Sequence, residues 1–537
     1  MRMQLSNTPE NRAAESSIGS AIAGFSPFHI PVLLLVSIGT AVVALLNSGT
    51  AILGWRPSDM ASIALNYYRH GFHFFYPQVN WGGSGPGYVE MEFPIIPYLT
   101  ALLYRFFGVH EWLGLIIPIA SGIGLVLCIY LFSRFVFDPA VGFVAGLFAA
   151  VSPTLMALSS GLWPDPAMIF CGALGLYALA VWVKNGTLFH FFLGAFGITS
   201  AILLKLTALY FGFPVLYLCI VKYPSLWWRR LDVWLLGLLI LIPPFLWYWH
   251  AFTLYREYHN TFGILSAGYL KFGSLEILSS PGFYTLNIVK AALYHITPVA
   301  FAALLYGLTV RHPNRVSYVF HVWLGALVIY ILVSARGVMI GHYQYLLPVV
   351  APAAVFAGVG TMEVLRRLES HTGLAQTPEK LKPLAFACVG VFLANAIFAS
   401  VLFDSRGLHD ISSYWRGEKR TGLAVGRITQ QGSLIIVADG QMDDFSPDRS
   451  MTPPDVFYFS DRRGWYVALS WLRPELIEKL KDQGGRYFVI TGNALAEFTA
   501  SYRHIEGYLS GRYTRILEST EGYVYDLSLV RSAEAMH

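Results

Sequence analysis

Long apolar runs dominate the first 403 residues of the chain. A bilayer core about 30 Å thick needs about 20 helical residues to cross it, and lipid offers no partners for an unpaired backbone. Eleven runs approach or exceed this length: 28–47, 112–134, 140–159, 164–184, 188–204, 206–222, 232–251, 289–310, 316–334, 343–362 and 383–403. The sequence therefore predicts a mainly α-helical, polytopic membrane protein with about eleven transmembrane helices.

Charge is scarce and evenly spread. Only 13% of the residues are charged, against about 25% in soluble domains, and the mean hydropathy is +0.52. The net charge of +5 is not gathered into the basic face that binds nucleic acid. Nucleic acid is therefore excluded as a partner.

The distribution of Lys and Arg predicts the orientation. Residues 1–27 are polar, and they read as a cytoplasmic tail before a first span that is retained as a signal anchor. The loops assigned to the cytoplasm hold most of the basic residues, whereas the outer loop 159–165 has none. An odd number of spans then places the C-terminus outside.

Three regions are expected: the tail, a transmembrane region 28–403 with a large first outer loop (48–111), and an extracytoplasmic α/β domain at 404–537. In the last region we expect strands at 433–439, 456–461, 486–492 and 523–529 and a helix at 473–485. No internal repeat of the kind found in inverted-repeat transporters is visible.

The first outer loop opens with "GWRPSDMASIALNYYRHG" (54–71), which has helical spacing and ends in a glycine. This helix is too short and too polar to span, so we expect it to lie on the outer surface. It carries Arg56 and Asp59. Ser58 or Asp59 could alternatively serve as a simple N-cap.

Three further carboxylates fall on the same side of the membrane. Glu90 and Glu92 lie two residues apart in the first outer loop, where an extended segment puts both on one face. A solvated loop is the alternative explanation for this pair. Asp165 precedes Pro166 at the start of an apolar run, so it could also be an N-cap followed by proline.

Cations occur at the same side. Lys205 is flanked by apolar residues, where a charge is costly and usually faces a partner or cavity, although snorkelling at a helix end is an alternative. The segment 333–352 adds Arg336, His342 and Tyr345. Together, these positions could bring an anionic lipid headgroup to a polar acceptor.

The ordered set resembles the GT-C class of membrane glycosyltransferases, specifically bacterial relatives of protein mannosyltransferases and aminoarabinose transferases. The matching pieces are Asp59, "EFPIIPYLTALLYRFFG" (92–108), "LWPDPAMIF" (162–170), the Lys205 segment and "HYQYLLPVVAPAAVFAG" (342–358). The resemblance covers about residues 28–403. It implies a GT-C helix arrangement, a place in the bacterial inner membrane, and a polyprenyl-phosphate-linked sugar as donor.

The resemblance also assigns roles. Asp59 would be the catalytic base, but Met60 stands where some members have a second acidic residue, so Glu90, Glu92 or Asp165 could supply the other carboxylate. We group Asp165 with Asp59 as catalytic. The predicted substrate-binding residues are Arg56, Glu90, Glu92, Lys205, Arg336, His342 and Tyr345.

Several alternatives stay open at this stage. The acceptor could be a lipid, a glycan or a protein, and the donor could be pyrophosphate-linked, as in a glycan polymerase or ligase. No segment has dedicated metal-ligand spacing, yet Mg²⁺ or Mn²⁺ could replace the cations. A transporter or flippase is the non-enzymatic alternative, but it would place charges nearer the middle of the bilayer.

Overall fold

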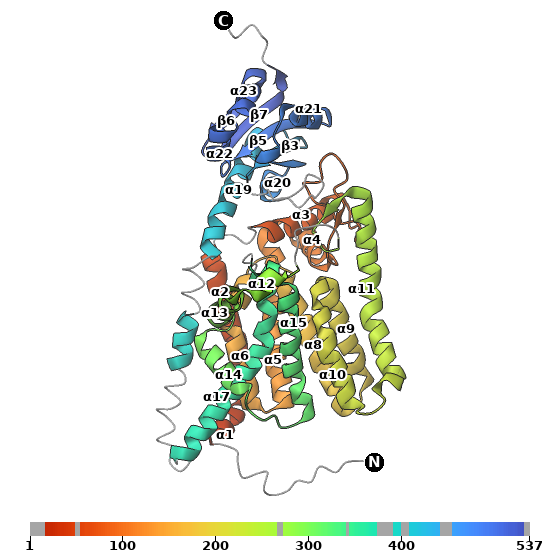
Figure 1. Ribbon diagram of the computed structural model, residues 1–537, viewed down its shortest axis with the longest axis vertical. Coiled ribbons are helices and arrows are strands. Elements are labelled where there is room, and N and C mark those ends of the chain that lie inside the picture. Colours follow the sequence, from red (N-terminus) through yellow and green to blue (C-terminus); the bar gives the residue numbers. More distant parts are fainter. Residues whose placement is uncertain are drawn as a thin grey trace.

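The computed structural model describes residues 17–48, 54–265, 272–339, 343–372, 390–398, 408–440 and 454–530. Figure 1 shows a bundle of helices at one end and a sheet with its helices at the other. Between them lie α3 (Trp55–His70) and α4 (Ile95–Phe107), which belong to the first loop. This middle layer carries several of the predicted site residues.

Among the described residues, six helices are long and apolar enough to cross a membrane, or up to eight if each bent pair counts as one span. The six stretches are Ser26–Leu46, Glu111–Val136, Asp165–Asn185, Leu231–Tyr258, Arg315–Val333 and Leu347–Ser370. The chain is thus a multi-pass membrane protein, and the described residues do not confirm the predicted number of eleven spans. The eleventh run, 383–403, lies mostly outside the described residues. Its described part, 390–398, is helical.

These spans correspond to α2 (Ser26–Ser48), η2 with α5 (Glu111–Leu115, Ile116–Val136), α8 (Asp165–Asn185), α11 (Leu231–Tyr258), η6 with α15 (Arg315–Tyr318, Val319–Val333), and η8 with α17 (Leu347–Val349, Val350–Thr372). Two of the runs counted as spans, 188–204 and 206–222, form apolar helices that are too short to count as spans. The apolar helix α9 (Leu188–Leu204) ends before Lys205, and η3 (Leu206–Phe211) and α10 (Gly212–Lys222) follow.

The run 140–159 is broken into α6 (Pro139–Ala150) and α7 (Pro153–Ser159), which are bent by 61°. Pro153 cannot continue a helix, and the Ser152 hydroxyl accepts a hydrogen bond from the Leu155 amide as the cap of a new helix. A second bent pair joins α13 (Pro281–Lys290) and η5 (Ala291–His295) to α14 (Pro298–Gly307). The other short elements are α1 (Ser17–Gly24), η4 (Trp227–Arg229), α12 (Leu275–Ser279), α16 (Ala335–Met339) and η7 (Tyr343–Tyr345).

The helix expected at the start of the first loop is present as α3, but it does not lie on an open surface. Residues 57–67 are all buried, because α3 packs on α4 on one side and on α20 (Asp455–Ser460) on the other. The first loop also contacts the loop that follows α11 (Leu231–Tyr258), which we call the second loop. Strand β1 (Val89–Glu90) pairs in parallel with β2 (Asn260–Thr261), directly after α11.

The carboxyl-terminal region contains a five-stranded sheet in the order β4-β3-β5-β7-β6. Strands β3 (Leu434–Asp439), β4 (Arg463–Ala468) and β5 (Gly485–Thr491) are parallel to one another. Strand β7 (Gly522–Val530) pairs antiparallel with both of its neighbours, β5 and β6 (Tyr513–Ser519). Its helices are α19 (Leu408–Ile428), α20, η10 (Leu469–Trp471), α21 (Pro474–Asp482), α22 (Leu495–Ser501) and α23 (Arg503–Arg512). The boundary predicted at 404 falls outside the described residues.

Three of the four expected strands coincide with β3, β5 and β7, and the expected helix coincides with α21. The fourth, at 456–461, is wrong, because these residues form α20. The helix begins right after Pro454, has Asp455 in its first turn and buries Val456, Phe457 and Ser460. A carboxylate in the first turn stabilises a helix. This effect outweighs the short alternation of apolar and polar residues on which the strand prediction is based.

Candidate functional site

Asp59 projects from α3 into the buried layer and is 1% exposed. Its Oδ1 accepts a hydrogen bond of 2.9 Å from the Trp81 indole Nε1, whereas its Oδ2 has no hydrogen-bond partner among the described residues. Burial raises the pKa of Asp59 well above its ordinary value. The carboxyl groups of Asp455 and Glu92 also raise the pKa, whereas Trp81 and Arg56 lower it.

The alternative of a simple cap is wrong for this helix. The N-cap position of α3 is Gly54, which lies five residues before Asp59, and no side chain of α3 caps the helix itself. Asp59 is therefore placed in the second turn with one oxygen unsatisfied. A buried polar atom without a partner is costly and calls for an explanation.

Arg56 lies one turn before Asp59 and pairs with Glu92 at 3.3 Å. The guanidinium also sits over the ring of Phe262, 4.5 Å from its centroid. Glu92 is buried, and Arg56 is only partly exposed. This pair places a cation next to Asp59 and fixes the end of the first loop against α3.

Glu90 joins the two loops. Its carboxylate accepts hydrogen bonds from the Thr261 hydroxyl and from the Leu265 amide, the latter at 2.8 Å. The Glu90 carbonyl accepts another from the Phe262 amide at 2.9 Å. Glu90 is fully buried, so a solvated loop is excluded for this residue.

A second ion pair joins Asp165 to Lys205 at 2.5 Å. The side chains are 2% and 17% exposed, respectively, so Lys205 is held by a partner and does not snorkel to the surface. Asp165 is not a cap either, because the N-cap position of α8 is Pro164. The ammonium of Lys205 also lies 5.7 Å from the centroid of the Tyr345 ring.

The two ion pairs are linked through the backbone. The amide of Phe93, next to Glu92, donates to the carbonyl of Leu203 at 3.0 Å, two residues before Lys205. The Tyr248 hydroxyl on α11 donates to the carbonyls of Ile202 and Leu203. The segment around Glu92 is therefore hydrogen-bonded to the C-terminal end of α9, directly before Lys205.

The remaining predicted residues are less well defined. Arg336, in α16, is half-buried and makes no ion pair with any residue that the structure describes. Its neighbour Gly337 lies against Tyr345, because a Cβ there would come 3.0 Å from the ring. His342 lies outside the described residues.

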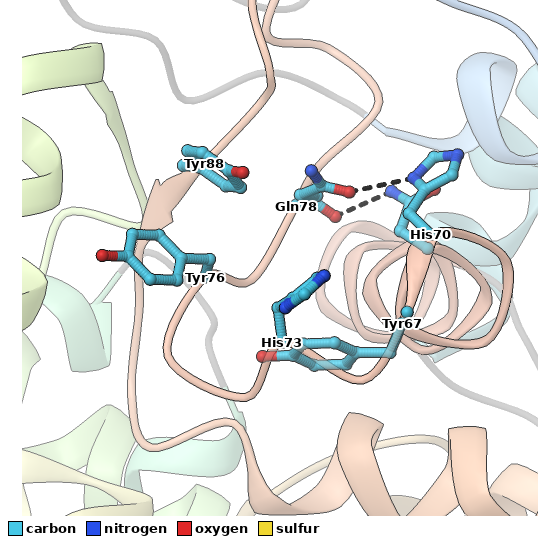
Figure 2. Close-up of a pocket in the computed structure, with 8 residues that line it drawn as sticks. Tyr67, His70, His73, Tyr76, Gln78 and Tyr88 are labelled. Carbon is cyan, nitrogen blue, oxygen red and sulfur yellow. Dashed lines mark hydrogen bonds between the residues drawn. The ribbon is translucent and has the colours of Figure 1, made fainter.

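A shallow pocket opens elsewhere on the first loop, at the end of α3 away from Asp59. Figure 2 shows Tyr67, His73, Tyr76 and Tyr88 around it, with His70 bonded to Gln78 through Nδ1 at 2.9 Å. None of the predicted site residues lines it. The pocket is therefore separate from the carboxylates and cations described above.

Comparison with known proteins bears on this arrangement. Residues 91–249 match the family model described as "Dolichyl-phosphate-mannose-protein mannosyltransferase". No curated protein sequence matches the chain. The fold resembles that of ArnT from Cupriavidus metallidurans, solved with bound undecaprenyl phosphate, with 13% identity, a TM-score of 0.62, and coverage of 94% of this chain and 98% of ArnT.

The archaeal oligosaccharyltransferase AglB from Archaeoglobus fulgidus, solved with an inhibitory peptide and a dolichol-phosphate, has a TM-score of 0.56 at 12% identity. That match covers 95% of this chain and 75% of AglB. The family match over residues 91–249 and the similarity to these two structures show a GT-C fold. The resemblance seen in the sequence is thereby confirmed.

The stretch matched by the family model contains only some of the predicted site residues. Glu92, Asp165 and Lys205 lie within the matched stretch, whereas Asp59 and Glu90 precede it. The assignment of Asp59 therefore depends on its burial and its unpartnered oxygen.

The carboxylates that the structure describes do not form a cage for Mg²⁺ or Mn²⁺. Within the described ranges, no group of three or more His, Cys, Asp and Glu side chains could hold a metal ion. Glu92 and Asp165 are each already paired with a cation from the protein. Positive charge next to these carboxylates therefore comes from Arg56 and Lys205.

Two residues that the sequence did not single out contribute to the site. Trp81 donates to Asp59, and it stands in the glycine-rich "WGGSGPG" segment, whose turns do not reveal where an indole points. Asp455 contacts the start of α3 from almost 400 residues away. No local sequence pattern predicts this contact, because it depends on how the carboxyl-terminal region packs against α3.

Proposed function

We propose that this protein is a glycosyltransferase that moves a sugar from a polyprenyl-phosphate-linked donor to a hydroxyl of a lipid, glycan or protein acceptor. The reaction would take place at the outer face of a bacterial inner membrane, with inversion at the anomeric carbon. The buried Asp59 carboxyl, with one oxygen unpartnered among the described residues of a GT-C fold, carries the proposal. The lipid phosphates in the ArnT and AglB structures support this donor class.

In the proposed step, Asp59 accepts the proton of the acceptor hydroxyl through Oδ2. The hydroxyl oxygen bonds to the anomeric carbon while the bond from that carbon to the phosphate oxygen breaks. The electron pair of that bond leaves on the lipid phosphate. A single displacement inverts the configuration, and burial raises the pKa of Asp59, which strengthens it as a base for proton transfer.

Cations would meet the charge that develops on the leaving phosphate. We assign this role to Lys205 and Arg336, with Tyr345 lining the same pocket and His342 as a further candidate. Lys205 is held by Asp165 at 2.5 Å, so Asp165 would keep the ammonium in place for the phosphate. Arg56 and Glu92 would orient the sugar or acceptor beside Asp59, and Glu90 would keep the two outer loops together.

The test is Asp59→Asn in purified protein, reconstituted in lipid with synthetic polyprenyl-phosphate sugars. Loss of the base should lower kcat about 10²- to 10⁴-fold, with donor binding retained, as followed by mass spectrometry of the product. Asp232→Asn is the matched control. Asp232 lies at the start of the 28-residue helix α11, whereas β2 and its contact with the first loop lie at the opposite end of that helix.

Near wild-type transfer by Asp59→Asn would disprove the assignment of the base. A product with retained anomeric configuration would disprove the single displacement. Activity only with pyrophosphate-linked donors would identify a polymerase or ligase instead. Movement of substrate across the membrane without any glycosyl product would favour a transporter.

A further inference from the structure

Helix α3 begins without a cap from its own sequence. Gly54 occupies the N-cap position, and no side chain of the helix bonds to the free amides of the first turn. In a capping box, a Glu at the third helical position reaches back to the N-cap amide, but Pro57 stands at that position here. The start of α3 therefore depends on a partner from elsewhere.

Asp455 is that partner. Its Oδ1 accepts hydrogen bonds from the Gly54 amide at 3.0 Å and from the Ser58 hydroxyl at 2.8 Å. Asp455 is fully buried, and a carboxylate at a helix N-terminus is favoured by the helix dipole. The contact fixes Ser58, which directly precedes Asp59 in the chain.

The carboxyl-terminal region also holds the other neighbour of Asp59. The Gly464 amide donates to the Asn80 carbonyl at 3.0 Å, and the Gly464 carbonyl accepts from the Gly83 amide at 2.8 Å. These two bonds flank Trp81, whose indole donates to Asp59. Both the helix that carries Asp59 and the indole that binds it are thus fixed by α20 and the start of β4.

The contact has an electrostatic consequence. Burial raises the pKa of Asp455 to about 7, opposed by the bonds from Ser58 and Gly54 and by the charge of Lys419. Asp455 faces Asp59 from α20, while Glu418 and Lys419 face Asp455 from α19. When ionised, Asp455 raises the pKa of Asp59, which Arg56 and Trp81 lower and Glu92 raises.

We propose that the carboxyl-terminal region completes the active site, with Asp455 as a positioning residue that caps α3 and sets the protonation of Asp59. The proposal rests on the proposed function for the role of Asp59. Asp455 touches neither donor nor acceptor in this scheme. It acts on the reaction only through the position and the charge environment of the base.

The experiment compares Asp455→Ala, Asp455→Asn and the control Asp461→Asn in full-length protein reconstituted in lipid. Asp461 also lies at the junction with the first loop, where it pairs with Arg69 at 2.5 Å, but it sits on the surface. Asparagine tolerates its positive φ of 53°. This control removes a carboxylate from the same interface without touching the start of α3.

We expect Asp455→Ala to lower kcat about tenfold to a hundredfold, as small displacements of a catalytic group do, with the KM for the polyprenyl-phosphate sugar little changed. Asp455→Asn keeps an acceptor oxygen and should lose less, but the acid limb of its pH profile should move to lower pH. This shift follows because the pKa of Asp59 falls when a neighbouring negative charge is removed. Asp461→Asn should match the wild type in both respects.

Hydrogen exchange supplies a readout independent of activity. The backbone amides of residues 54–56, 58 and 59 should exchange faster in Asp455→Ala and stay protected in Asp461→Asn; Pro57 has no amide hydrogen. Unchanged exchange together with an unchanged acid limb in Asp455→Asn would overturn the proposal. If Asp59→Asn retained transfer, the proposed function would fail, whereas the cap would still be judged by exchange alone.

Discussion

At the scale of single residues, two effects shift the pKa of Asp59 in opposite directions. Hydrogen bonding to an ionised carboxylate lowers its pKa, and burial raises it. The Trp81 indole supplies the hydrogen bond, while the surrounding layer supplies the burial. The activity of Asp59 as a base should therefore respond to changes at Trp81.

Trp81→Phe tests this balance. It keeps an aromatic ring but removes the N–H donor, so the pKa of Asp59 should rise further and less carboxylate should be present at a given pH. We expect kcat/KM on the acid limb of the pH profile to fall several-fold and the acid limb to move to higher pH, opposite to Asp455→Asn. The exposed Trp228 gives the control Trp228→Phe. An acid limb that stays in place would contradict the role of the indole.

At the scale of elements, the site depends on the point where α9 stops and η3 begins. Lys205 has an extended backbone there, with φ −160° and ψ 120°, and its ammonium meets Asp165 at the start of α8. Two helices are thus joined by a charge pair that is almost entirely buried. Removing one partner of such a pair leaves an uncompensated charge.

Lys205→Met should lower the free energy of unfolding by about 3–5 kcal/mol, because Asp165 would remain buried and alone. Adding Asp165→Asn removes that charge and should restore much of the stability, as measured by thermal unfolding in detergent. Transfer should stay low in both variants, because the cation for the donor phosphate is missing. A double variant that regained both stability and full transfer would show that Lys205 is only structural.

At the scale of the whole molecule, the carboxyl-terminal region and the first loop share a buried carboxyl group. The pKa of Asp455 is about 7 in the folded protein, against an ordinary value of 3.8. The folded state then binds more protons than the unfolded state between these two values. The contribution of Asp455 to stability is complete below about pH 4 and is lost as the pH rises through 7.

Thermal unfolding measured from pH 5 to pH 8 should therefore show a midpoint that decreases with rising pH. Asp455→Asn cannot titrate, so its midpoint should decrease less over the same interval. Asp461→Asn, altered at the same junction but outside the buried contact, should keep the wild-type slope. An equal slope in Asp455→Asn would mean that this carboxyl does not change its ionisation on folding.

The sequence by itself determined the class of the protein, because apolar runs and sparse charge leave few options besides a helical membrane protein. It also indicated α3, three strands and the charged residues of the outer side, since each has a local pattern. The GT-C resemblance depended on the order of these pieces along the chain. The number of spans is not confirmed by the described residues, and apolar length alone does not reveal a break such as the one at Pro153.

The tertiary structure decided which charges meet. Asp165 could have capped its own helix, but Lys205, 40 residues away, is its partner. Asp59 accepts a hydrogen bond from Trp81, and the start of α3 is hydrogen-bonded to Asp455, which lies almost 400 residues later in the chain. Hydrogen bonds and ion pairs act over about 3 Å, so partners distant in sequence are fixed only when packing brings their elements together.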